Sequence, residues 1–167
     1  MNFRTIVSKI LIVATLALVA CQAEPKTNLE RVDALKKQVQ DHATTLNELE
    51  TKEFTQLQKD FMACDSMLQF LHPEEVDEVF QQLQLVGAYI SQFKETCPVM
   101  RADIDTTLIQ LNNLRSDIET HYLSDSLVAI YLDTESQHVT RINNQVEYFK
   151  DRFASCKKDL KEFKKKK

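Results

Sequence analysis

Residues that form turns are almost absent from this chain, which has 167 residues but only one glycine and three prolines. Folds rich in strands need many turns, and turns depend on glycine, asparagine and proline for particular backbone angles. The plentiful residues here are leucine, glutamine, glutamate and lysine, which tolerate the helical conformation well. The scarcity of turn residues therefore predicts an all-α protein built from long helices.

The first twenty residues differ in composition from the rest of the chain. A short basic segment with Arg4 and Lys9 precedes an uncharged apolar run over residues 10–20. A run of about 11 residues is too short to span the ~30 Å hydrocarbon core of a bilayer as a permanent helix. It fits the apolar region of a signal peptide, so we expect residues 1–20 to be one.

The apolar run ends in Leu18-Val19-Ala20-Cys21, which resembles the lipobox of bacterial lipoproteins. The resemblance implies diacylglyceryl transfer to Cys21, cleavage before that residue, and usually acylation of the new amino group with a chain such as palmitate. Two or three acyl chains anchor a protein stably, whereas a single chain does not. Residues 21–28 would then be the lipidated cysteine and a short tether. The alternative is an ordinary secretory signal followed by an unrelated cysteine.

The residues after Cys21 bear on location. In the enterobacterial sorting rule, aspartate directly after the cysteine retains a lipoprotein in the inner membrane, so Gln22 implies the outer membrane. Gln22-Ala23-Glu24 also resembles the start of a Bacteroidetes surface-export signal, although Pro25 replaces its second acid. The expected location is therefore the bacterial outer membrane, lipid-anchored, on the periplasmic face or at the cell surface.

Apolar residues recur at spacings of three and four over residues 29–163, which predicts a helical bundle domain there and a basic tail at 164–167. The phase of the first stripe slips by one residue between Leu49 and Phe54 and then resumes. One long helix with a local irregularity accounts for this slip. We expect that helix to end at His72-Pro73, because a residue before proline disfavours the α conformation.

The second helix is expected to begin at Pro73, a residue suited to the first helical position, and to end in a turn at Thr96-Cys97-Pro98. A heptad seam then extends from Met100 to Phe163. It is weakest at residues 121–125, and a break near residues 122–126 gives an antiparallel bundle of four helices. The alternative has three helices, of which the last is a long unbroken coiled-coil helix that protrudes or forms a homodimer.

Three cysteines remain after Cys21, and all three occupy the apolar stripe: Cys64, Cys97 and Cys156. A compartment beyond the inner membrane permits disulfides. In the four-helix arrangement Cys97 and Cys156 approach the same end of the bundle, so these two are the disulfide candidates. The alternative is that all three are small buried apolar residues.

Three short motifs, Asp65-Ser66-Met67, Asp105-Thr106-Thr107 and Asp125-Ser126-Leu127, resemble the acceptor of the Bacteroidetes periplasmic O-glycosylation system. The resemblance implies glycan attachment to Ser66, Thr106 and Ser126. The motif is only three residues long, and chance alone would supply roughly one match in a chain of this length.

No arrangement of residues in the sequence predicts catalysis or a cofactor. With Gly87 as the one glycine, a phosphate-binding loop is excluded in its usual forms, and the formal charge of −4 does not indicate a nucleic-acid partner. Glu135 and His138 form one Glu-x-x-His pair, whereas di-iron bundles need two such pairs and further carboxylates. His121 and Asp125 lack an obvious third ligand.

Three functions remain open at this level. The first is a structural or interaction lipoprotein that is anchored in the membrane and contacts a protein partner at the envelope. The second is a periplasmic holdase-like helper, which requires an exposed apolar groove between helices. The third is a metal-binding helical bundle. The sequence favours the first and predicts no enzyme activity.

Overall fold

The structure is a computed structural model that describes residues 27–70 and 73–165. Its elements in chain order are α2 (Asn28–Glu48), the π-helical turn η1 (Leu49–Phe54), α3 (Thr55–Asp65), the 3-10 turn η2 (Leu68–Phe70), α4 (Pro73–Glu119) and α5 (Asp125–Phe163). No strand occurs within these two ranges. The all-α class predicted from the scarcity of turn residues is therefore confirmed.

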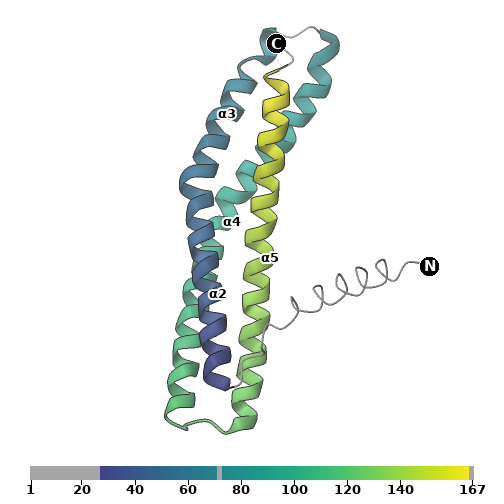
Figure 1. The fold of residues 1–167 in the computed structure, drawn as a ribbon. Helices are drawn as coiled ribbons and strands as arrows, with labels where there is room; N and C mark the ends of the chain where they lie inside the picture. The colour runs from purple at the N-terminus through teal and green to yellow at the C-terminus, as the bar shows by residue number, and fades with distance from the viewer. Residues whose placement is uncertain (1–26, 71–72, 166–167) are drawn as a thin grey trace, which may run out of the picture.

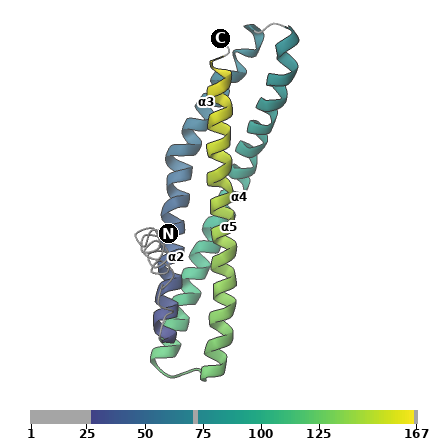
Figure 2. The ribbon, with the colours of Figure 1, turned by 45° about the vertical axis from the view of Figure 1, so that its right-hand side comes forward.

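The helices form an elongated bundle of three columns (Figures 1 and 2). The first column is α2, η1 and α3 in sequence, and it runs in the same direction as α5, while α4 runs the opposite way. At 1.5 Å per residue, the 39 residues of α5 span about 58 Å. We call the end with Asn28 and the α4–α5 turn the tether end, and the end with Phe70 and Phe163 the far end.

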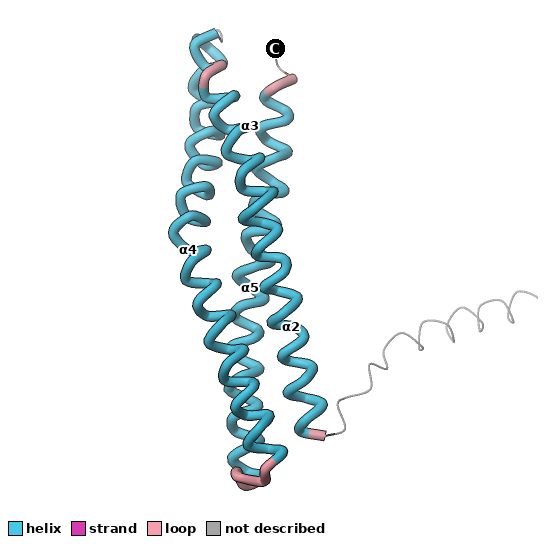
Figure 3. Tube along the Cα trace, turned by 90° about the vertical axis from the view of Figure 1, so that its left-hand side faces the viewer, coloured by secondary structure: helices cyan, strands magenta, loops and turns pink. Residues whose placement is uncertain are grey.

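The expected count of four helices is wrong, because α4 continues through the predicted turn at Thr96-Cys97-Pro98. The buried residues Phe93, Cys97 and Met100 keep a spacing of four and three across this site, so one helix buries all of them. Pro98 itself is exposed, and the carbonyl group that loses its hydrogen bond therefore faces water. Figure 3 shows α4 bowed along its length, as a proline within a helix commonly causes.

The predicted break near residues 122–126 is confirmed, and the alternative of one unbroken helix from Met100 to Phe163 is wrong. The helix α4 ends at Glu119 and α5 begins at Asp125. His121 adopts a left-handed backbone conformation with φ of 53°, which a continuous helix cannot contain. Ser124 has the extended backbone of an N-cap residue, as the serine and aspartate residues here predicted.

The expected irregularity in the first helix is also confirmed, and its form is the π turn η1. Buried and partly buried core residues together are spaced by three or four up to Leu49, and the next seam residue, Phe54, follows after five. A π turn accommodates one extra residue without ending the helix. Leu57 and Cys64 consequently return to the buried face in α3.

Phenylalanine rings fill the middle of the bundle next to η1. The ring of Phe93 lies 5.1 Å from Phe54, 5.1 Å from Phe149 and 4.8 Å from Phe153, measured between centroids. Tilted and edge-to-face pairs at these distances are favourable beyond the area that they bury. These four residues, which come from all three columns, form what we call the aromatic layer.

Gly87 allows α3 and α4 to approach closely above the aromatic layer. A Cβ atom at this position would lie 3.3 Å from Cζ of Phe61, which is tighter than ordinary van der Waals contact. The single glycine of the chain therefore has a packing role within a helix.

Candidate functional site

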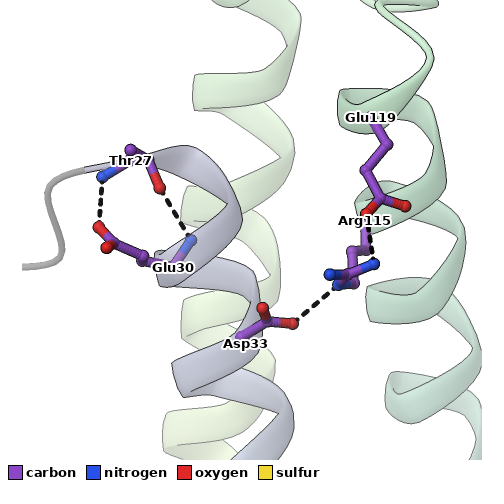
Figure 4. A network of polar contacts seen from close by, with 5 residues as sticks. All are labelled: Thr27, Glu30, Asp33, Arg115 and Glu119. Atoms are coloured by element: carbon purple, nitrogen blue, oxygen red, sulfur yellow. Dashed lines mark hydrogen bonds and ion pairs between the residues drawn. The ribbon is translucent and has the colours of Figure 1, made fainter.

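The tether end begins with a capping box that fixes the first residue of α2 (Figure 4). The backbone N–H of Glu30 donates to Oγ1 of Thr27 at 3.2 Å, and the backbone N–H of Thr27 donates to Oε2 of Glu30 at 2.8 Å. This reciprocal pair satisfies N–H groups that the first turn of a helix otherwise leaves without partners. The chain therefore enters the bundle at a defined point directly after residues 21–26.

A second set of contacts joins this point to α4. Arg115 donates from Nε to Oδ1 of Asp33 at 2.9 Å and from Nη1 to Oε1 of Glu119 at 2.6 Å, as Figure 4 shows. The hydrogen bond to Asp33, with the charges of both carboxylates, raises the pKa of the Arg115 guanidinium. The start of α2 and the end of α4 are thus held side by side at the tether end.

Cys21 and the signal-peptide segment lie outside the described residues, so lipidation stays a prediction. Across residues 27–70 and 73–165, none of the helices combines the length and the apolarity needed to cross a bilayer.

Cys64, Cys97 and Cys156 are all buried free thiols. Burial raises the pKa of each thiol, and that of Cys156 reaches about 11. A thiol with a raised pKa is a poor nucleophile near neutral pH. The Sγ atom of Cys64 lies 3.8 Å from the carbonyl oxygen of Leu160 and donates to it. The three cysteines therefore have the properties of small apolar core residues.

The structure does not bring the disulfide candidates Cys97 and Cys156 together. Two cross-helix hydrogen bonds, Tyr148 to Gln92 and Arg141 to Asp103, each of 3.3 Å, set the level of Cys97 within α5 between residues 141 and 148. Cys156 lies eight residues beyond Tyr148, which is about 12 Å of helical rise. A disulfide requires Cα atoms within about 6.8 Å. The pairing was expected because Cys97 was placed in a turn, whereas it lies within α4.

The three predicted glycosylation residues, Ser66, Thr106 and Ser126, are all exposed. They lie directly after α3, in the last third of α4 and in the first turn of α5, so the structure spreads them along the rod rather than grouping them. The hydroxyl group of Ser66 donates to the carbonyl oxygen of Ala63 at 2.9 Å, and that of Ser126 lies 3.1 Å from Oγ of Ser124. Glycan attachment stays a prediction.

The Glu135 and His138 pair lies on α5, with Nδ1 of His138 3.6 Å from Oε2 of Glu135. Glu135 is 7% exposed, and burial raises the pKa of its carboxyl group while the charge of His138 opposes that shift. In the described ranges no cluster of three histidine, cysteine or acidic residues is arranged to hold a metal ion. Within the same ranges Oε2 of Glu135 accepts no hydrogen bond.

A groove of about 530 Å³ between α4 and α5 was not predicted from the sequence. Its walls are Gln92, Thr96, Gln137, Thr140, Arg141, Asn144, Gln145, Tyr148 and Phe149. Eight of these nine residues carry an amide, hydroxyl or guanidinium group, but the surface that they expose to the groove is mainly apolar. Most of these residues are polar and lie beside the apolar seam. The spacing of apolar residues therefore does not predict where they form a groove.

A second feature missed at the sequence level is a group of exposed apolar side chains at the tether end: Tyr122, Leu127, Ile130 and Tyr131. Leu127, Ile130 and Tyr131 lie off the seam that continues through Val128 and Leu132. The sequence did contain a signal for this group: Leu127, Ile130 and Tyr131 are apolar residues at positions i, i+3 and i+4, which predicts an apolar face beside the seam.

Comparisons of the chain with protein-family models, with curated proteins and with solved structures find no match.

Proposed function

We propose that this protein is a lipid-anchored envelope lipoprotein whose three-helix rod acts as a structural and interaction module. The observation that carries the proposal is the position of α2. It begins at Asn28, seven residues after Cys21 of the lipobox-like sequence, and near one end of the rod, close to the α4–α5 turn. A lipid on Cys21 would therefore hold the rod by its end rather than by its side.

Anchoring at the tether end would hold the far end away from the lipid. Seven residues reach at most about 25 Å, and the rod adds about 58 Å along α5. The far end exposes Met62 and Phe70, which are 70% and 75% exposed, beside the lysine-rich end of α5. Methionine and phenylalanine are enriched at protein–protein interfaces, whose rim is polar, so this end is suited to contact a protein partner across the envelope.

Ion pairs join the first column to α5 beside the aromatic layer and nearer the far end, which supports a stiff spacer. Lys157 pairs with Glu53, and Nζ of Lys164 lies 2.5 Å from Oδ1 of Asp60. The latter hydrogen bond lowers the pKa of Asp60 and raises that of Lys164. These contacts join the first column to the end of α5, so that the end of α5 is held against α3.

The test is a Cys21→Ser variant expressed in a bacterium that processes lipoproteins. Wild-type protein is expected in the membrane fraction, with an intact mass equal to residues 21–167 plus a diacylglyceryl group, with or without a third acyl chain on the amine. The variant is expected to lose all acyl mass and to accumulate as unprocessed precursor or as soluble protein. A Cys97→Ala variant is the matched control and should keep the acyl mass. A mature start other than Cys21, or wild-type protein without acyl mass, contradicts the proposal.

A further inference from the structure

Four apolar side chains are exposed together at the tether end of the rod, and we call them the tether-end patch. Tyr122 is 78% exposed, Ile130 59%, Tyr131 46% and Leu127 42%. Leu127, Ile130 and Tyr131 share one face of the first turns of α5, because residues three and four apart are neighbours on a helix. Tyr122 belongs to the turn that immediately precedes this helix.

The backbone beneath the tether-end patch is well supported. The N–H of His121 donates to the carbonyl of Ile118 at 3.2 Å, and the N–H of Tyr122 donates to that of Asp117 at 2.9 Å. Leu123 packs against the core, so its neighbour Tyr122 is directed to the outside. The patch is therefore a fixed surface of the fold, and its four side chains are displayed on a helix and a hydrogen-bonded turn.

This patch lies at the same end of the rod as the residue where the tether enters. In Figures 1 and 3 the start of α2 and the α4–α5 turn lie at one end of the molecule, and the bond between Asp33 and Arg115 joins the two regions. Residues 21–28 span at most about 25 Å even when fully extended. If Cys21 carries lipid, the patch is held within reach of the membrane surface at all times.

We infer that the tether-end patch inserts into the headgroup boundary of the membrane that holds the lipid anchor, an inference that rests on the proposed lipidation of Cys21. Tyrosine favours this boundary because its ring is apolar and its hydroxyl group can stay hydrated. Leucine and isoleucine gain free energy by leaving water for the acyl region. A contact of this kind would orient the rod on the membrane, which a lipid on Cys21 alone would not do.

The charges around the patch identify the kind of lipid surface. Asp117, Glu119 and Asp125 lie on or beside the α4–α5 turn, and Arg115, the cation nearest to them along the chain, is already bonded to Asp33 and Glu119. Like charges repel, so an anionic surface would oppose the contact. The inferred surface is therefore rich in zwitterionic headgroups.

The experiment uses the full lipidated protein in vesicles of phosphatidylethanolamine and phosphatidylcholine. An environment-sensitive fluorophore is attached to a cysteine introduced by Ile130→Cys, and a lipid with a quencher in its headgroup region is added. The native thiols are buried, and burial raises their pKa, so they react slowly with the label. Val99→Cys and Phe70→Cys are the matched controls, since these apolar residues are 58% and 75% exposed in α4 and at the far end.

The label at position 130 is expected to shift its emission to shorter wavelength and to lose most of its fluorescence to the quencher, while the labels at 99 and 70 change little. Equal quenching at all three positions, or none at 130, overturns the inference. Energy transfer between labelled copies at position 130 without lipid quenching assigns the patch to a second copy of the chain instead. A wild-type protein that carries no lipid refutes the proposed function. One that is lipidated but shows no quenching at 130 refutes only the membrane contact.

Discussion

The two halves of the rod bury different chemistry along the same seam. Toward the far end, the aromatic layer brings four phenylalanine rings from all three columns into contact. Toward the tether end, most of the buried residues are aliphatic. Two buried residues there are polar instead, namely Thr107 and Glu135, which are 2% and 7% exposed. One heptad pattern therefore supports a strongly cohesive half and a half that contains a buried acid.

This difference separates two contributions to folding. Packed aromatic rings stabilise the bundle at any pH, whereas a buried carboxyl group stabilises or destabilises it according to its protonation. We expect mutations near the aromatic layer to have large effects that do not depend on pH. Mutations near Glu135 should have smaller effects that do.

The largest effect is expected from Phe93→Ala, because Phe93 is 1% exposed and contacts three other rings of the aromatic layer. Removing a buried phenylalanine side chain typically costs about 3–5 kcal/mol of stability. Chemical denaturation followed by circular dichroism measures the loss. Phe80→Ala, at a residue of the same helix that is 46% exposed, is the control and should cost much less. Similar losses for the two variants would refute the central role of the aromatic layer.

An intermediate effect of opposite sign is expected from Pro98→Ala, at the junction between the halves. Proline in a helix interior is about 3 kcal/mol less favourable than alanine. Part of this gain is offset, because proline also restricts the unfolded chain by roughly 0.4–1 kcal/mol. The variant should therefore unfold with a free energy about 2 kcal/mol higher. A destabilised variant would show that α4 depends on the bend at Pro98.

The smallest effect concerns the pH dependence that Glu135 introduces. Because burial raises its folded-state pKa above the ordinary value of 4.5, the folded protein binds more protons than the unfolded one between the two values. The free energy of unfolding should therefore decrease as the pH rises through this window. Glu135→Gln should remove this decrease, and a folded-state pKa one unit above the unfolded value corresponds to about 1.4 kcal/mol.

Asp60 at the far end supplies a control of opposite sign for that titration. The hydrogen bond from Lys164 lowers its pKa below the ordinary value of 3.8, so its contribution to stability is lost as the pH falls. Asp60→Asn should remove a loss of stability at acid pH and leave the decrease caused by Glu135 unchanged. Identical pH profiles for wild type and both variants would show that neither carboxyl group is coupled to folding.

Apolar spacing was sufficient to predict most of the fold. It identified the slip between Leu49 and Phe54 and, together with the capping residues, the break before α5, while the preferences of proline identified the start of α4 at Pro73. Each of these features changes the phase of the seam or places a cap beside it. The turn predicted at Pro98 was wrong because the tendency of proline to end a helix was given more weight than the continuous spacing of the apolar seam. Phe93, Cys97 and Met100 keep their phase across it, and their burial outweighs the cost of one lost hydrogen bond.

The candidate surfaces were harder to predict than the core. The seam specifies which residues face inward, but the groove beside Tyr148 depends on which polar side chains of α4 and α5 lie opposite each other. That pairing depends on the axial register of two helices, which the spacing within each helix does not contain. The prediction that Cys97 and Cys156 lie close together failed for the same reason. It assumed that a helix ends at Pro98, and this assumption placed both residues at the wrong positions along the bundle axis.

The π turn η1 has a consequence for how the columns of the bundle match in length. One additional residue in the first column is absorbed locally within Leu49–Phe54, and the downstream residues Leu57 and Cys64 still reach the core. A single insertion or deletion in a coiled-coil seam normally turns every later apolar residue away from its partner. Here the turn confines the change to about one helical turn. Columns of unequal residue count can therefore remain matched in length along the bundle.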